Sequence, residues 1–231
     1  RTKTKGIITI IMEIKVNGVT LHYTKRGSGD PLILLHGNGE DLTIFDPLAE
    51  KLAEHFTVYA IDSRNHGKSE KTDQYHYETM RDDILEFIEV LNIETPHVLG
   101  FSDGSIVTML MAIKAQNRLN RLILLGPNLT PDDLTDACLR YVRILYTKTQ
   151  DPLYKMMMDE PNITPDELKN VQNRTLVIGA ENDLYKPMTF ERIVGALPHS
   201  ELTIIKGHDH GSYIVNNDLI YEDVFTFLTQ D

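Results

Sequence analysis

The segment Gly100-Phe101-Ser102-Asp103-Gly104 sets a serine between two glycines. A short apolar run at 97–101 leads into it and an apolar helical pattern at 105–115 follows it. Ser102 is therefore predicted at a sharp turn between a strand and a helix. Such a turn strains the serine backbone, needs small residues two positions to either side, and exposes the hydroxyl. The pattern predicts a nucleophile, although the pentapeptide alone also fits a plain glycine-rich turn.

A serine hydroxyl is a poor nucleophile near neutral pH and needs a neighbouring base. Of the nine histidines, His208 and His210 follow the last predicted strand in a glycine-containing loop. The base needs a carboxylate that fixes its tautomer. Asp183 lies just past the preceding predicted strand, with Glu181 as an alternative closer to the strand end. These residues predict a relay of serine, histidine and acid, with either histidine as the base.

A second glycine-rich loop, His36-Gly37-Asn38-Gly39, directly follows the apolar run at 31–35. Backbone N–H groups that are free in such a loop can stabilise a negatively charged oxygen on the substrate. We expect the N–H groups of Asn38 and Asp103 to form this oxyanion hole. An ordinary turn is the alternative for this loop, and His36 is expected to brace it without acting as the base.

Short apolar runs alternate with longer amphipathic segments along the chain, which predicts an α/β fold with a mostly parallel sheet and helices on both faces. Asn17-Gly18 predicts a hairpin turn, and Asp46-Pro47 predicts a helix capped by Asp46. The other predicted strands are 31–35, 57–61, 97–101, 122–125, 175–179 and 201–205, and the other predicted helices are 80–91, 105–115, 187–197 and 219–228.

Three parts of the chain differ in composition. Residues 13–127 and 173–231 carry the strand and helix alternation and are expected to form one core. The polar, largely helical segment 128–172 is expected to be a small cap over the sheet edge, with helices that begin at Thr130 and Thr164. Residues 1–12 are treated as an extra N-terminal segment, because Met12 opens a convincing strand.

Several separate motifs together resemble the α/β-hydrolase superfamily over nearly all of residues 13–231. They are the loop at 36–39, the stretch Asp62-Ser-Arg-Asn-His-Gly-Lys-Ser69, the glycine-flanked serine, the Gly-x-x-x-Asp stretch ending at 183 and the Gly-x-x-His stretch ending at 210. The resemblance implies an α/β-hydrolase fold and hydrolysis of a small-molecule carboxylic ester through an acyl-enzyme. Aligning Gly207 with the family's glycine places the base at His210. Asn65 departs from the glycine that relatives usually have.

The resemblance also bears on the substrate. A Ser-Asp-Gly subgroup of the superfamily includes hydrolases of amino-acid esters, so the resemblance implies that the Asp103 carboxylate contacts a substrate ammonium group. The alternative is that Asp103 only occupies the first turn of a helix, where the helix N-terminus favours anions. Met157 in the cap could line an adaptable apolar pocket or belong to ordinary cap core. A serine nucleophile excludes the aspartate chemistry of related epoxide hydrolases and dehalogenases. Carbon–carbon bond hydrolysis, peptidase activity and cofactor-free peroxidation stay open.

Composition limits the partners. The formal net charge of −11 disfavours nucleic acid and anionic membrane surfaces. A single cysteine, Cys138, cannot form an intrachain disulfide and fits a reducing cytoplasm. The predicted mechanism needs no cofactor, and the His208-x-His210 pair lacks further ligands for a zinc site.

Asp62 and His66 are expected to be structural. A hydrolase-fold binding or receptor protein with little turnover is the competing class of function.

Overall fold

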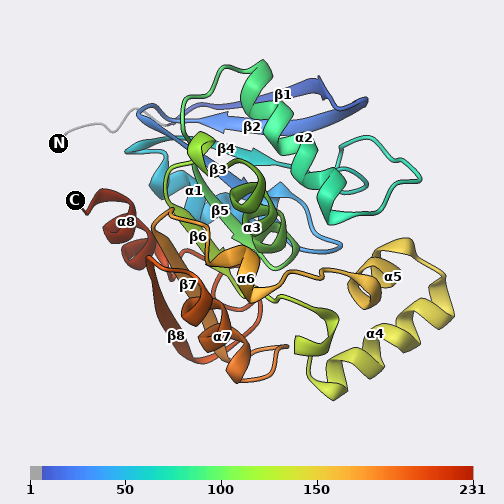
Figure 1. Ribbon diagram of the computed structural model, residues 1–231. Helices are drawn as coiled ribbons and strands as arrows, with labels where there is room; N and C mark the ends of the chain where they lie inside the picture. The colour runs from blue at the N-terminus through green and yellow to red at the C-terminus, as the bar shows by residue number, and fades with distance from the viewer. Residues whose placement is uncertain (1–6, 231) are drawn as a thin grey trace.

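The computed structural model describes residues 7–230, which form an eight-stranded sheet with helices on both faces (Figure 1). The strand order is β1-β2-β4-β3-β5-β6-β7-β8, with β1 and β2 antiparallel to their neighbours and the remaining pairs parallel. The α/β prediction is therefore confirmed. The strands are β1 Thr9–Val16, β2 Val19–Arg26, β3 Asp30–Leu35, β4 Phe56–Ile61, β5 His97–Phe101, β6 Leu122–Leu125, β7 Thr175–Asn182 and β8 Ser200–Asp209.

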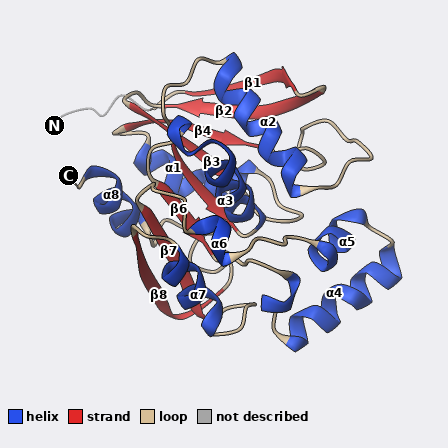
Figure 2. Ribbon diagram, viewed as in Figure 1, coloured by secondary structure: helices blue, strands red, loops and turns tan. Residues whose placement is uncertain are grey.

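The sheet separates the hydrophobic core into two layers. Each layer lies between one face of the sheet and the helices that cover it (Figure 2). Residues of α2, α3, α6 and α7 pack on one face, and residues of α1 and α8 pack on the other. The parallel strands read as continuous apolar runs because both of their faces are covered. The helices are α1 Asp46–Leu52, α2 Tyr77–Val90, α3 Asp103–Ala115, α4 Asp136–Thr149, α5 Pro152–Asp159, α6 Pro165–Leu168, α7 Met188–Ala196 and α8 Tyr221–Thr229, with 3₁₀ turns η1 Leu42–Phe45, η2 Gln116–Arg118 and η3 Pro131–Asp133.

The N-terminal strand begins earlier than the sequence predicts. β1 opens at Thr9, which pairs with Arg26, and not at Met12. Residues 9–12 of the segment set apart as 1–12 therefore belong to this strand, and residues 1–6 lie outside the described part of the chain. Ile10 and Ile11 are exposed on this edge strand. The sequence therefore lacks the alternation of apolar and polar residues that would have predicted a strand here. The hairpin turn at Asn17-Gly18 is found as predicted.

The start of α1 and the end of β8 also differ from the predictions. Asp46 is the first residue of α1 and not its cap; the N-cap position belongs to Phe45, because η1 runs directly into α1. The Asp46 carboxylate instead pairs with Arg26 on β2. β8 extends four residues beyond the predicted end, to Asp209, so His210 follows it immediately.

The segment 128–172 contains η3, α4, α5 and α6 between β6 and β7. Figure 1 shows α4 and α5 standing apart from the sheet, on one side of the molecule. Thr130 and Thr164 each form a capping box with an acidic residue three positions later, as their sequence pattern predicts. Buried apolar residues of this segment join the core layer of α2 and α3; they include Leu129, Met156, Ile163 and Leu168.

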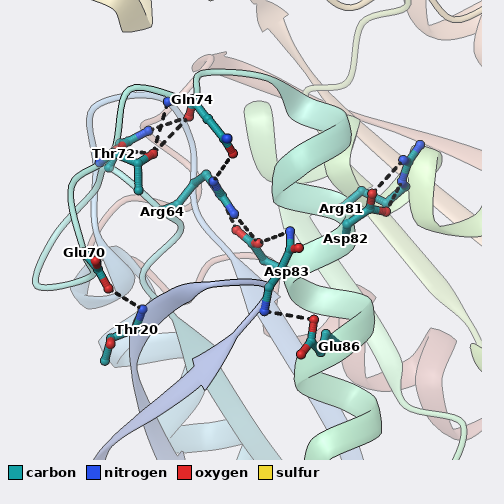
Figure 3. Close-up of polar contacts among 11 residues, drawn as sticks. Thr20, Arg64, Glu70, Thr72, Gln74, Arg81, Asp82, Asp83 and Glu86 are labelled. Atoms are coloured by element: carbon teal, nitrogen blue, oxygen red, sulfur yellow. Dashed lines mark hydrogen bonds and ion pairs between the residues drawn. The ribbon is translucent and has the colours of Figure 1, made fainter.

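A buried ion pair ties the loop after β4 to α2 and to the first hairpin (Figure 3). Arg64 donates from Nε and Nη2 to the two carboxylate oxygens of Asp83, at 2.6 and 2.5 Å. Asn17 donates to the same carboxylate at 2.9 Å, and Arg64 also donates to Gln74. Both members of the pair are almost completely buried, so each charge depends on the other for compensation.

Replacing Asp83 with asparagine is expected to lower the free energy of unfolding by about 3–5 kcal/mol, because Arg64 is left charged, buried and poorly paired. Urea denaturation followed by circular dichroism measures the change. Asp166→Asn is the matched control, since the Lys169–Asp166 pair is exposed and little change is expected there. Equal stability losses in the two variants would contradict the role given to Arg64.

Candidate active site

Ser102 lies at the turn from β5 into α3 with φ 52° and ψ −115°, outside the regions that non-glycine residues normally adopt. The flanking glycines make this turn sterically feasible. A β-carbon on Gly100 would lie 2.1 Å from the Gly104 carbonyl oxygen, and one on Gly104 would lie 2.0 Å from the Leu35 carbonyl oxygen. The Ser102 N–H donates to the Leu125 carbonyl at 2.8 Å, which fixes the turn to β6. The serine is thus held in a strained conformation by its surroundings.

Three loops at the carboxyl ends of the strands bring Ser102, His210 and Asp183 together. His210 Nε2 lies 2.9 Å from Ser102 Oγ, and His210 Nδ1 lies 2.7 Å from Asp183 Oδ1. The Asp183 side chain is 2% exposed, and it also accepts the N–H groups of Ala180 and Leu184. These backbone bonds hold the carboxylate in place, so it can orient the imidazole ring.

The alternative base, His208, and the alternative acid, Glu181, make other contacts. His208 Nδ1 lies 3.1 Å from the hydroxyl of Ser212, and Glu181 accepts the N–H of Gly207 at 2.8 Å. Both Glu181 and Gly207 belong to or border the β7–β8 ladder. Neither the His208 nor the Glu181 side chain takes part in the hydrogen bonds of Ser102 or His210.

The imidazole of His210 is enclosed by residues that the sequence did not single out. Its ring lies 4.9 Å from Phe101 and 5.3 Å from Tyr185, between centroids. A β-carbon on Gly126 would lie 2.6 Å from His210 Cε1, so a glycine is needed where the loop after β6 passes the ring. Tyr185 is buried, and burial raises the pKa of its hydroxyl well above the usual value. No sequence motif marks Gly126 or Tyr185.

The loop after β3 presents the predicted oxyanion donors. Buried His36 accepts the N–H of Ser63 at Nε2, 3.0 Å away, so its Nδ1 carries the proton and donates to the Gly37 carbonyl at 2.8 Å. Burial, with His66 nearby, lowers the pKa of His36 to about 4 and keeps the ring neutral. Because a trans peptide points its N–H away from its C=O, fixing the Gly37 carbonyl also aims the N–H of Asn38. His36 therefore braces the loop.

The side chain of Asp103 forms a buried cluster with Asn38 and Tyr77. Its Oδ2 accepts from Asn38 Nδ2 at 3.0 Å, and its Oδ1 accepts from the Tyr77 hydroxyl at 2.9 Å. Burial raises the pKa of the Asp103 carboxyl, although both hydrogen bonds oppose that change. Within residues 7–230 the backbone N–H groups of Asn38 and Asp103 have no protein partner, so both can donate to a ligand. A substrate contact of the Asp103 side chain stays a prediction.

Glu40 is a functional candidate that the sequence analysis missed. Its Oε2 accepts the N–H of Gly37 at 3.0 Å. Burial raises the pKa of this carboxyl to about 7, and the hydrogen bond from the Gly37 N–H and nearby His210 partly offset the rise. The residue follows a glycine-rich loop in which a polar side chain normally faces solvent, so nothing in the sequence signalled its position beside the site.

The cap reaches the site through α5. Asn38 Nδ2 lies 3.4 Å from the carbonyl of Leu153, in the first turn of that helix. Met157 lies one helical turn further on and is half-buried, whereas its neighbour Met156 is in the core. At the other end of the helix, Glu160 accepts the N–H of Tyr77. Contact between Met157 and a substrate stays a prediction.

Asp62 and His66 have structural contacts, as the sequence analysis expects. Asp62 accepts the N–H groups of Leu42 and Lys68 and binds His22 Nδ1 at 2.9 Å. His66 Nδ1 bonds the carbonyl of Arg64. Across residues 7–230, no group of three or more histidine, cysteine, aspartate or glutamate side chains is arranged to hold a metal ion.

The sequence profile of the α/β hydrolase fold family matches residues 30–154, more than half of the 231 residues. The chain belongs to the α/β-hydrolase fold family. The match includes the loop at 36–39 and Ser102, whereas Asp183 and His210 lie beyond it. Among solved structures, this α/β-hydrolase is similar to the carboxylesterase CesB of Bacillus subtilis, with a TM-score of 0.83, 19% identity and coverage of 96% of this chain and 92% of that one.

Two further relatives are informative. A meta-cleavage product hydrolase, CumD of Pseudomonas fluorescens IP01, superposes with a TM-score of 0.80 at 20% identity, covering 94% of this α/β-hydrolase and 97% of that chain. The human serine hydrolase BPHL is 33% identical over 125 residues, which are 50% of this chain and 42% of BPHL. The aligned segment thus spans less than half the length of that curated relative. Helices of a length and hydrophobicity suited to crossing a membrane are absent from residues 7–230.

Proposed function

We propose that the protein is a serine hydrolase that cleaves small-molecule carboxylic esters. Ser102 is the nucleophile, His210 the general base and Asp183 the acid that orients it. The observation that carries this proposal is the continuous pair of hydrogen bonds, 2.9 Å from Ser102 Oγ to His210 Nε2 and 2.7 Å from His210 Nδ1 to Asp183 Oδ1. An ionised carboxylate accepts hydrogen bonds only, so it favours the proton on Nδ1 and leaves Nε2 free to take the serine proton.

The reaction proceeds in two acyl-transfer steps. His210 takes the Ser102 proton as Oγ attacks the ester carbonyl, and the resulting imidazolium protonates the departing alcohol. The acyl-enzyme that forms is then attacked by a water molecule, activated by the same imidazole. The N–H groups of Asn38 and Asp103 stabilise the oxyanion in both steps, each such donor contributing about 3 kcal/mol to lowering the barrier.

An ester is the substrate that makes the fewest demands on these residues. An alcohol leaving group needs only the proton that His210 already holds, whereas hydrolysis of a carbon–carbon bond also requires a proton at carbon. The similarity to CesB agrees with an ester, and the similarity to CumD keeps carbon–carbon hydrolysis as the second candidate. The carboxylate of Asp103 beside the nucleophile supports amino-acid esters as one subclass.

A fluorophosphonate probe combined with turnover of p-nitrophenyl acetate tests the proposal. We expect covalent labelling on the peptide that contains Ser102, detected by mass spectrometry, together with multiple turnovers of the ester. Labelling with only a single turnover would instead favour a hydrolase-fold receptor. Intact protein that reacts with neither reagent would remove the case for a serine hydrolase.

A further inference from the structure

The oxyanion loop closes on itself through Glu40. The Glu40 N–H donates to the Gly37 carbonyl at 3.4 Å, and the Glu40 carboxylate accepts the Gly37 N–H at 3.0 Å. A β-carbon on Gly37 would lie 2.7 Å from Glu40 Oε2 and 3.1 Å from the β-carbon of Ser102. The carboxyl group and the nucleophile therefore both lie against this glycine, which leaves no space for a side chain there.

These contacts hold both peptide groups of Gly37. Its N–H is taken by the Glu40 carboxylate, and its carbonyl by His36 Nδ1 and the Glu40 N–H. Gly37 has no side chain that could restrict its backbone torsions. The direction of the following N–H, that of Asn38, then depends on these hydrogen bonds. An oxyanion donor is effective only when it is already aimed at the position where the charge develops.

We propose that Glu40 is a positioning residue that holds the Gly37–Asn38 peptide in the orientation needed for oxyanion stabilisation. This inference rests on the proposed serine hydrolase function. Glu40 acts through the loop and not on the substrate, so its contribution falls mainly on the step in which the oxyanion forms.

Ionisation of Glu40 adjusts the strength of this hold. A carboxylate accepts an N–H more strongly than a neutral carboxylic acid does. Burial raises the pKa of Glu40 to about 7; the Gly37 hydrogen bond and His210 lower it, whereas Asp103 and Asp41 raise it further. The carboxyl group is therefore largely protonated below neutral pH and ionised above it, so the hold on Gly37 strengthens as pH rises.

Glu40→Ala and Glu40→Gln separate the hydrogen bond from other effects of the side chain. For Glu40→Ala we expect kcat on p-nitrophenyl acetate to fall roughly ten- to a hundredfold with little change in KM, as for loss of an interaction made mainly in the transition state. Glu40→Gln keeps a neutral oxygen that can accept the Gly37 N–H, so it should restore part of kcat. Asp41→Asn is the control, because it removes the adjacent carboxylate, which bonds Thr43 in the same loop.

The pH profile supplies a readout that a purely structural role would not move. The ratio of wild-type to Glu40→Gln kcat/KM should rise as pH increases through neutrality, because only the wild type gains the stronger carboxylate acceptor. Any ionisation that the two enzymes share cancels in this ratio. Circular dichroism melts of each variant, taken beforehand, identify any loss of fold.

Three results would overturn the inference. They are a folded Glu40→Ala variant with wild-type kcat, a Glu40→Gln variant no more active than Glu40→Ala, and a ratio of wild-type to Glu40→Gln kcat/KM that does not change with pH. Each leaves the serine hydrolase proposal standing, provided that the wild type is labelled at Ser102. Absence of both labelling and turnover in the wild type would overturn the proposed function and this inference together.

Discussion

Ser102→Ala is expected to lower kcat/KM for p-nitrophenyl acetate by at least about three orders of magnitude, with the fold unchanged. Alanine keeps the β-carbon, so the strained φ of 52° at this turn costs the folded state no more than it does with serine. The hydroxyl donates its hydrogen bond to His210 Nε2. Its removal takes away the atom that we propose forms the acyl-enzyme and little else.

Initial rates with purified protein, at enzyme concentrations high enough to detect a thousandfold loss, measure the effect. Ser105→Ala is the matched control, because it deletes a buried hydroxyl on the same helix that bonds only the Ser102 carbonyl. We expect that variant to keep activity within about tenfold of the wild type, the size of a single hydrogen bond. A Ser102→Ala protein with near-normal turnover would assign the chemistry to another group.

Much of the fold follows from local sequence signals. The run at 97–101 is bounded as predicted because every one of its residues is buried between helices on both faces, which leaves no polar position to blur its limits. Thr130 and Thr164 mark their helix starts because a capping box needs only residues three positions apart. Signals of this kind are contained within a few residues of chain.

Features that depend on distant parts of the chain were missed. β1 is an edge strand whose Ile10 and Ile11 are exposed, so only its pairing with β2 defines it. Gly126 matters because His210, far along the chain, passes over it. In the sequence Glu40 resembles an ordinary loop residue, and its half-buried position beside Ser102 depends on packing that no short window of sequence contains. The members of the relay were easier to propose, since the resemblance fixes their order along the chain.

Asp183→Asn is expected to lower kcat roughly 10³- to 10⁴-fold, because an amide of the same shape cannot replace the carboxylate in this setting. Two backbone N–H groups, from Ala180 and Leu184, already donate to the Asp183 oxygens. The amide nitrogen must therefore face another donor wherever it is placed. When it faces His210, it favours the tautomer with the proton on Nε2, which cannot accept the proton of Ser102.

Glu181→Gln provides the comparison for this second prediction. It makes the same acid-to-amide change two residues earlier, in a side chain that accepts only the Gly207 N–H. We expect kcat of Glu181→Gln to stay within a few-fold of the wild type, since the glutamine oxygen can keep that hydrogen bond. Steady-state rates for both variants decide between the two acids. A larger loss for Glu181→Gln than for Asp183→Asn would mean that the hydrogen bond of 2.7 Å between Asp183 and His210 does not orient the base during turnover.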